Sequence, residues 1–322
     1  MSRSVAVGVA LTVVSALSFG SGALFAKPVY AAGVDWHTLM AWRFLLGAAC
    51  GWAWVLAFPM RREALRSMDR RTLVVAVLLG VLYTGNSGTY YAALESVPAS
   101  LGALIVYVYP VLVAVASLRV GRRLEGRRAW GALVLATLGV ALAVGNIETS
   151  TAPPLGGLLL MLASPVIYTV WIVLAARFSG ERRTGVGREA AGAADPVVAG
   201  VLMMTATAAT YWLSALAAGR PVLPAQIPPV AWGGVVGVGV ISTFVAIQAF
   251  YGGAHRIGAA RASLVSTVEP VWTIGLAGLL LGESLTPLQL VGGGLILFGV
   301  VLAQTGSGAS PPSAGALRIA DE

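Results

Sequence analysis

The chain has 322 residues, of which 57% are hydrophobic and only 11% are charged, and its formal net charge is +8. A soluble domain of this length needs far more charge to cover its surface, so the composition excludes a soluble protein and indicates an integral membrane protein. The basic residues lie in short clusters between apolar stretches, which does not favour a nucleic-acid partner. One cysteine and two widely separated histidines predict neither an internal disulfide nor a metal site.

Ten apolar segments follow one another with short connectors, and each is close to the roughly 20 residues that a membrane-spanning helix needs. The predicted fold is therefore all-α, a polytopic membrane protein of ten transmembrane helices embedded in a lipid bilayer. We expect these spans at residues 5–31, 37–58, 72–93, 99–118, 129–145, 155–176, 197–218, 230–251, 259–281 and 287–304.

The cations are distributed unequally between the two sets of connectors. Connectors after odd-numbered spans contain Arg220 alone, whereas those after even-numbered spans, together with the termini and with Arg261 at the start of the ninth span, hold 18 of the 21 Lys and Arg residues. Short connectors rich in Lys and Arg remain on the cytoplasmic side. This pattern predicts a multi-pass protein of the cytoplasmic membrane with both termini in the cytoplasm.

The chain also repeats itself after a shift of 160 residues. This shift aligns Tyr90–Val111 with Phe250–Val271 and pairs Pro110 with Pro270. Each half holds five predicted spans, and an odd number inverts the second half in the membrane relative to the first. The predicted domains are two inverted five-helix repeats and a cytoplasmic tail: 1–150, 151–306 and 307–322.

The largely apolar segment Ser263–Gly282 contains one carboxylic acid, Glu269, near its middle. A carboxylate among lipid tails costs roughly 2.5–3.5 kcal/mol or more unless it is protonated, paired or facing water, so Glu269 is a functional candidate. Pro270 follows it and frees the carbonyl of Ser266, which then needs a polar neighbour. In a cavity Glu269 can exchange a proton or hold a substrate ammonium; alternatively, it only bonds a neighbouring helix. The shift of 160 residues pairs Glu269 with Tyr109 in the first half.

Arg43 lies about six residues into the second predicted span. A guanidinium at this depth can pair with a substrate carboxylate. The alternative is that Arg43 extends along its helix to the outer interface, which is also what we expect of Lys27, the only lysine of the chain.

Polar and aromatic side chains recur in the middle of other spans. Two amides, Asn86 and Gln248, are the clearer signals because buried amides need partners, although such amides more often join helices. Aromatic side chains suit the wall of a cavity that takes a partly apolar ligand. The candidate substrate-binding or coupling residues are therefore Glu269, Tyr109, Arg43, Asn86, Gln248, Tyr168, Trp171 and Trp272.

The ten-span layout, the repeat and the segment Leu264–Leu285, LVSTVEPVWTIGLAGLLLGESL, resemble the drug/metabolite transporter superfamily, specifically its EamA-type members. The most specific part is the Glu-Pro step, which is followed thirteen residues later by Gly-Glu at Gly282 and Glu283. The Arg43-Phe44 step in the second span resembles an Arg-Phe position of that family.

Two positions depart from the family pattern. Phe19 replaces the tryptophan of a Trp-Gly step in the first span. In the first half, Tyr109 and Arg123 stand where the Glu-Pro and Gly-Glu signature would be mirrored. The two halves are therefore not expected to carry symmetric roles.

The resemblance implies export of amino acids or related small metabolites through a cavity between the halves, by a single polypeptide acting as a monomer. We predict a secondary transporter that works by alternating access, without a cofactor or enzymatic activity, and coupling to protons through Glu269 is a hypothesis. Efflux of hydrophobic drug-like compounds is the alternative if aromatic side chains instead of Arg43 dominate the cavity. A polytopic membrane enzyme or a receptor is a further alternative from another class.

Overall fold

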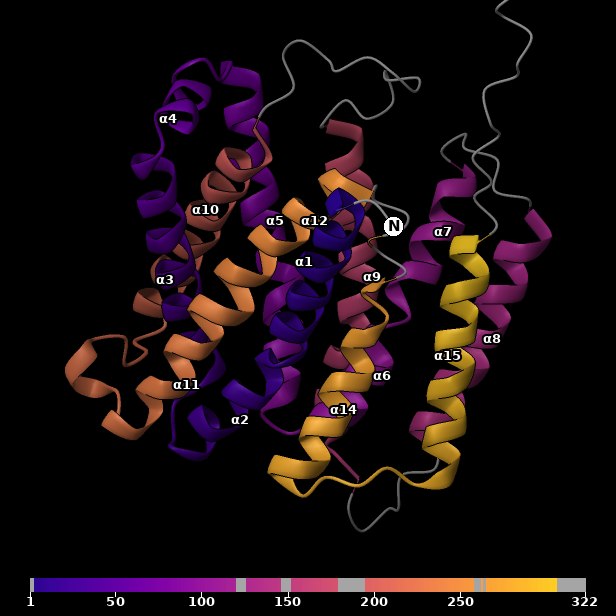
Figure 1. Cartoon of the computed structure of the whole chain (residues 1–322). Helices are drawn as coiled ribbons and strands as arrows, with labels where there is room; N and C mark the ends of the chain where they lie inside the picture. The colour runs from indigo at the N-terminus through magenta and orange to yellow at the C-terminus, as the bar shows by residue number, and fades with distance from the viewer. Residues whose placement is uncertain are drawn as a thin grey trace, which may run out of the picture.

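The computed structural model describes residues 3–119, 126–145, 152–178, 195–257, 262 and 265–305. These residues form helices and contain no strand (Figure 1). In chain order the helices are α1 (Arg3–Gly20), α2 (Gly22–Ala31), α3 (Trp36–Ala57), α4 (Pro59–Arg66), α5 (Arg70–Leu94), α6 (Ala99–Val106), α7 (Tyr109–Arg119), α8 (Gly126–Gly145), α9 (Leu155–Phe178), α10 (Pro196–Ala217), the 3₁₀ turns η2 (Pro224–Gln226) and η3 (Pro229–Ala231), α11 (Trp232–Val236), the π-helix η4 (Gly237–Val245), α12 (Ala246–Ile257), α14 (Val268–Leu281) and α15 (Pro287–Thr305).

Six helical segments of the described chain are long and apolar enough to cross a membrane, and they coincide with six of the predicted spans. They are Ser4–Ala31, Trp36–Ala57, Arg70–Leu94, Leu155–Leu174, Val197–Ala217 and Pro229–Ala254. The four other predicted spans contain shorter apolar helices, Ala99–Val113, Trp130–Ala143, Val268–Leu281 and Pro287–Leu302. The chain is therefore an all-helical, multi-pass membrane protein.

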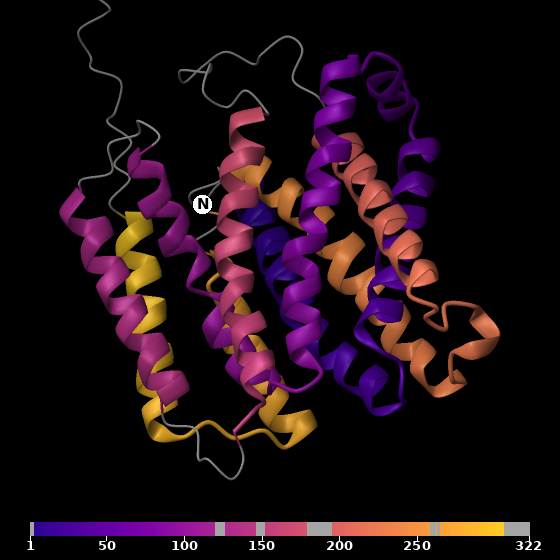
Figure 2. The same ribbon diagram turned by 180° about the vertical axis from the view of Figure 1, so that it is seen from behind.

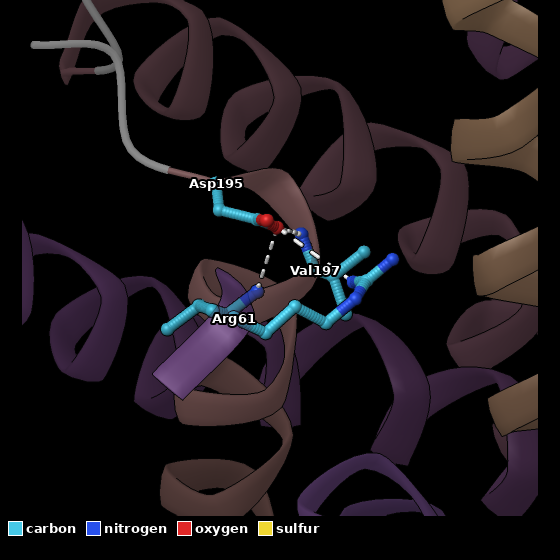
Figure 3. Close-up of polar contacts among 4 residues, drawn as sticks. Arg61, Asp195 and Val197 are labelled. Atoms are coloured by element: carbon cyan, nitrogen blue, oxygen red, sulfur yellow. Dashed lines mark hydrogen bonds and ion pairs between the residues drawn. The ribbon is translucent and has the colours of Figure 1, made fainter. Parts of the chain in front are cut away.

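Aspartate side chains cap the N-termini of three long helices, with Asp35 before α3, Asp69 before α5 and Asp195 before α10. Asp35 accepts hydrogen bonds from the backbone N–H groups of the first turn of α3, and Asp195 accepts them from Val197 and Val198 at the start of α10. Such caps satisfy donors that have no partner within the helix. Asp195 also lies 3.8 Å from Nη1 of Arg61 on α4, so this cap joins two segments that are far apart in the sequence (Figure 3).

Two of the shorter segments are interrupted near their middle. The predicted fourth span divides into α6 and α7 at Tyr107, and in the predicted ninth span a turn at Ser266 and Thr267 separates the helical Val265 from α14, which begins at Val268. A proline, Pro110 or Pro270, follows each interruption within three residues. Because proline lacks a backbone N–H, it cannot bond the carbonyl four residues earlier, and the helix is interrupted there. The expectation of two continuous helices is therefore wrong.

Helices of the first half pack mainly on helices of the second half. The contacts join α3 to α10, α1 to α12, α5 to α9, and α8 to α15, and this last pair forms one edge of the molecule in both views (Figures 1 and 2). A Cβ atom at Gly139 of α8 would lie 2.5 Å from the carbonyl oxygen of Gly292 on α15. Small residues allow this close approach, which packing between helices in lipid depends on.

Side chains tie three connectors together at one end of the bundle. Lys27 donates from Nζ to the carbonyl oxygen of Val97 at 2.7 Å, and the N–H of Trp36 donates to Glu95 at 2.7 Å. Glu283 accepts from the N–H groups of the first two residues of α6 at 2.9 and 2.8 Å. Lys27 therefore bonds the connector between α5 and α6, and Glu283 caps a helix of the other half.

Candidate functional site

Glu269 lies in the first turn of α14, directly after the interruption of that segment. Its side chain is half-buried and, within the described part of the chain, has no hydrogen bond or ion pair. Tyrosines from α5, α7, α9 and the end of α6 lie within electrostatic reach of its carboxyl group. We call these residues the tyrosine cluster: Tyr83, Tyr90, Tyr91, Tyr107, Tyr109 and Tyr168.

Polar contacts hold the segment that carries Glu269 on two sides. The hydroxyl of Tyr107 donates to the carbonyl oxygen of Ser266, which is the carbonyl that Pro270 frees. On the other side, Trp272 donates from Nε1 to Ser21 Oγ at 3.1 Å, where α1 passes into α2. The sequence predicts that the carbonyl of Ser266 needs a polar neighbour, and this neighbour is Tyr107, which lies at the interruption between α6 and α7.

Aromatic rings form a continuous wall beside Glu269. The ring centre of Tyr109 lies 4.7 Å from that of Tyr168, which stacks on Trp171 at 5.9 Å with an angle of 19° between the rings. Tyr83 meets both Tyr168 and Trp171 at larger angles. The fold thus brings three of the predicted residues, Tyr109, Tyr168 and Trp171, into one group from α7 and α9.

Arg43 lies in α3 with only 6% of its surface exposed. Its Nε donates to Thr243 Oγ1 of η4 at 2.8 Å, and its Cζ lies 4.5 Å from the ring centre of Tyr91. Among the described residues no carboxylate pairs with it. Because Arg43 points to another helix and is buried there, this geometry does not fit a side chain that reaches the outer interface.

Arg43 and Glu269 share part of the tyrosine cluster. Tyr83, Tyr90 and Tyr91 lie within electrostatic reach of both charged groups. The two groups nevertheless form no ion pair with each other. A cation from α3 and an acid from α14 therefore stand at different points of one tyrosine-rich surface, each without a partner of opposite charge in the described chain.

Two other predicted residues, Asn86 and Gln248, have different surroundings. Asn86 accepts from Ser164 Oγ at 3.0 Å and so joins α5 to α9, and Trp171 joins the same helices by donating to the carbonyl oxygen of Leu79 at 2.9 Å. Gln248 lies on α12, and its Nε2 is buried without a hydrogen bond. Asn86 therefore connects helices, whereas Gln248 retains an unused donor.

The sequence interpretation did not single out Tyr83 and Tyr90. Tyr83, Asn86 and Tyr90 occupy positions i, i+3 and i+7 of α5, and this spacing places the three side chains on one face of the helix. Because Asn86 was already a candidate, the helical spacing of 3.6 residues per turn could have indicated these two tyrosines as its neighbours on the same face. Thr243 was recognisable as a polar residue in the middle of a predicted span, but its contact with Arg43 depends on α3 lying against η4. In the described part of the chain, no group of three or more His, Cys, Asp or Glu side chains is placed to hold a metal ion.

An apolar groove of about 500 Å³ lies apart from this site, between α3 and α10. Trp52 of α3 crosses it and donates to Thr205 of α10 at 2.9 Å. Its remaining lining is small or apolar, so it offers little polar recognition: Leu45, Ala48, Ala49, Ala208, Ala209 and Trp212.

Comparison with known families gives a match over most of the chain. The sequence pattern of the EamA-like transporter family matches residues 6–145 and again residues 155–305. The two matches therefore fall one in each half of the chain.

Individual relatives are similar over nearly their whole length. An uncharacterized transporter of Bacillus subtilis, YcbK, is 26% identical over 304 residues, which is 92% of either chain. An uncharacterized transporter of Archaeoglobus fulgidus is 27% identical over 94% of this chain and 97% of its own. A solved crystal structure superposes with a TM-score of 0.61 at 22% identity, over 92% of this chain and 96% of the other, and shows a similar fold.

Proposed function

Because the chain belongs to the EamA-like transporter family, we propose that it is a secondary transporter that exports a small amphipathic metabolite, an amino acid or a related compound, across the cytoplasmic membrane. Membership of this family makes the chain a membrane transporter, which moves a small molecule across a lipid bilayer. The residues of the candidate site then suggest which kind of molecule is moved.

The observation that carries this proposal is the pair of unpaired opposite charges on one tyrosine-rich surface. Arg43 is buried without a carboxylate partner, and Glu269 has no cationic partner in the described chain. A buried cation without a partner is costly, so Arg43 favours an anionic ligand group, and the half-buried carboxyl group of Glu269 can accept a cationic one. A zwitterion with a partly apolar body satisfies Arg43 with its carboxylate, Glu269 with its ammonium, and the tyrosine cluster with its remaining surface.

Several features support alternating access by two inverted repeats in a ten-span fold. The family pattern matches each half once, over 6–145 and 155–305. The interruptions at Tyr107 and Thr267 are 160 residues apart, like the repeat itself. Interrupted helices near the middle of a membrane are typical of transporter sites, because their free backbone groups are tolerated only next to protein or a wet cavity.

The packing of the helices is consistent with such a repeat. The first and eighth predicted spans pack through α1 and α12, and their mates, the sixth and third, pack through α9 and α5. The fifth span packs on its own mate, the tenth, through α8 and α15. We propose repeats at 1–150 and 151–306; the tail, 307–322, lies outside the described residues.

The positions of the charged residues support an orientation with cytoplasmic termini and a monomeric transporter. The helix α4 carries Arg61, Arg62 and Arg66, and the positive-inside rule assigns it and both termini to the cytoplasm. The charged groups of the site come from both halves of one chain, Arg43 from the first and Glu269 from the second. A monomer therefore contains the whole proposed site.

Efflux of hydrophobic compounds is the second candidate function. The aromatic wall of Tyr83, Tyr109, Tyr168 and Trp171 and the apolar groove between α3 and α10 favour it. Such a substrate would not need the two charged groups. Transport of neutral apolar compounds that does not respond to substitution of Arg43 or Glu269 would support this function instead.

The experiment that tests the first proposal is counterflow in proteoliposomes, with a labelled mixture of L-amino acids, with and without a pH gradient. If Glu269 exchanges the coupling proton, Glu269→Gln loses movement driven by the gradient while it still folds, because the amide cannot titrate. The matched control is Glu63→Gln, since Glu63 is an exposed acid on α4.

Each outcome decides one part of the proposal. Gradient-driven movement that disappears only in Glu269→Gln supports both the substrate class and coupling. Counterflow that is equal in all three proteins leaves a facilitator in which Glu269 is structural. If no L-amino acid moves in the wild type, the proposed substrate class is wrong.

A further inference from the structure

The Arg43 side chain bonds a neighbouring helix that has an unusual local geometry. Span eight contains a π-helical segment of nine residues, η4, and Thr243 Oγ1 donates to the carbonyl oxygen of Val238, five residues earlier, at 2.9 Å. Segments of this kind are rare and occur frequently at functional sites. Here the segment directs two adjacent hydroxyl side chains, Ser242 and Thr243, into the protein, where they are 1% and 0% exposed.

Thr243 is fixed between η4 and α3. A Cβ atom at Gly47 of α3 would lie 2.9 Å from its methyl group, so only the small residue at this point allows the contact. With its methyl group held there, Thr243 presents its oxygen to Arg43 Nε at 2.8 Å. This bond orients the guanidinium over Tyr91, whose hydroxyl group also interacts with Arg43, and the guanidinium retains outer donors for a further acceptor. The contact that Nη1 makes is with Met40 Sδ at 4.0 Å, and a thioether is a weak acceptor.

Ser242 supplies a second unused group next to the same ring. Its Oγ is buried and has no hydrogen-bond partner among the residues that the structure describes. A Cβ atom at Gly22 would lie 2.7 Å from the hydroxyl oxygen of Tyr91 and 3.5 Å from Ser242 Oγ, so both oxygens approach the same point of the backbone. Tyr91 is the ring over which the Arg43 guanidinium lies. A buried hydroxyl without a partner is uncommon in proteins and favours a bound group that can accept its hydrogen bond.

We infer that η4 builds the anionic end of the substrate site: Thr243 positions Arg43, and Ser242 donates its hydroxyl to the carboxylate that Arg43 binds. This inference rests on the proposed transport of a zwitterion and names the residues that recognise its carboxylate. Arg43 and Ser242 contact the ligand, whereas Thr243 is a positioning residue that acts through Arg43. The π-helical geometry is needed because it directs both adjacent hydroxyls inward.

The test compares acids with their primary amides in reconstituted full-length protein. The probes are L-phenylalanine and L-leucine, each against its amide, which keeps the side chain and the ammonium but lacks the carboxylate. Variants are Thr243→Val, which keeps the shape and removes the hydroxyl, Thr243→Ser, which keeps the hydroxyl, and Ser242→Ala. Thr210→Val is the matched control, because the Thr210 hydroxyl bonds only the carbonyl oxygen of Ala206 in its own helix.

For Thr243→Val and Ser242→Ala we expect KM for the acids to rise about tenfold, the size expected for one lost hydrogen bond to a charged group, with little change in kcat. The KM for the amides changes little, Thr243→Ser restores the preference for acids, and Thr210→Val behaves as the wild type. A purely structural role of Thr243 would instead change the acids and amides equally.

Two results overturn the inference and can be told apart. If the wild type prefers the acids and Thr243→Val and Ser242→Ala both keep that preference, η4 does not build the anionic end, and the proposed function stands. If the wild type treats each acid and its amide alike, no anionic subsite exists, and the role of Arg43 in the proposed function is wrong as well.

Discussion

At the scale of single residues, Pro270 connects a local backbone defect to the candidate site. It removes the donor for the carbonyl of Ser266, and the hydroxyl of Tyr107 takes that place. The same carbonyl also accepts from the N–H of Glu269 at 3.0 Å. The acid is thus held at the interruption by a backbone bond, while its own carboxyl group remains unpaired.

Replacing Tyr107 with phenylalanine removes the hydroxyl and leaves the ring in place. We expect Tyr107→Phe to lower the free energy of unfolding by about 0.6–2 kcal/mol, because hydrogen bonds between membrane helices contribute this much, and the second donor to Ser266 keeps the loss small. Thermal unfolding in detergent measures it. Tyr251→Phe is the control, since the Tyr251 hydroxyl has no hydrogen-bond partner in the described chain. Equal unfolding temperatures for all three proteins would contradict a stabilising role of this bond.

At the scale of elements, the half-length helix α6 depends on an acid from the other half of the chain. Pro98 precedes it and provides no side-chain cap. Glu283, directly after the left-handed Gly282 that ends α14, accepts from the N–H groups of Ala99 and Ser100 and from the Ser100 hydroxyl. A carboxylate at a helix N-terminus satisfies free donors and interacts favourably with the helix dipole.

The substitution Glu283→Ala leaves these donors without their acceptor. We expect a loss of about 1–2 kcal/mol in the free energy of unfolding, with a smaller loss for Glu283→Gln, because the amide keeps one acceptor oxygen. Chemical unfolding followed by tryptophan fluorescence measures both. Glu63→Ala is the control on an exposed helix. A loss in Glu283→Ala no larger than in this control would show that the cap does not stabilise α6.

At the scale of the whole molecule, the cations divide the connectors into two classes. The connector 119–128 is rich in arginine, and most of it lies outside the described residues, but its charge is known from the sequence. Loops with such charge resist translocation and fix the orientation of the spans next to them. The number of spans and the charge pattern together give the proposed topology.

Replacing the five arginines of 119–128 with glutamine is expected to scramble the orientation of a fraction of the molecules. Single cysteines at Ser67 and Gln226, both exposed and on opposite sides in the proposed topology, report this in a Cys50→Ala background. In intact cells an impermeant maleimide labels only Gln226→Cys of the unchanged chain, and both cysteines after the substitution. Unchanged labelling would count against the proposed orientation.

The sequence by itself determined the class of protein and the position of an acidic residue in the middle of an apolar span. Low charge, long apolar segments and the half-repeat predict a multi-pass helical protein because lipid allows only backbones that satisfy their own hydrogen bonds. The same reasoning marked Glu269 as a candidate and Ser266 as a carbonyl in need of a donor. These inferences depend on local composition, so they required no knowledge of which helices are neighbours.

Only the tertiary structure decided which groups meet. The π-helical geometry of η4, the bond from Arg43 to Thr243 and the approach of Tyr83 and Tyr90 to both charged groups join residues that are up to 200 positions apart. Almost every side chain in a membrane span is apolar, so hydrophobic periodicity says little about the face that a helix turns toward its neighbours. Close contacts at small residues and a few polar bonds set those faces, and they exist only once the helices are packed.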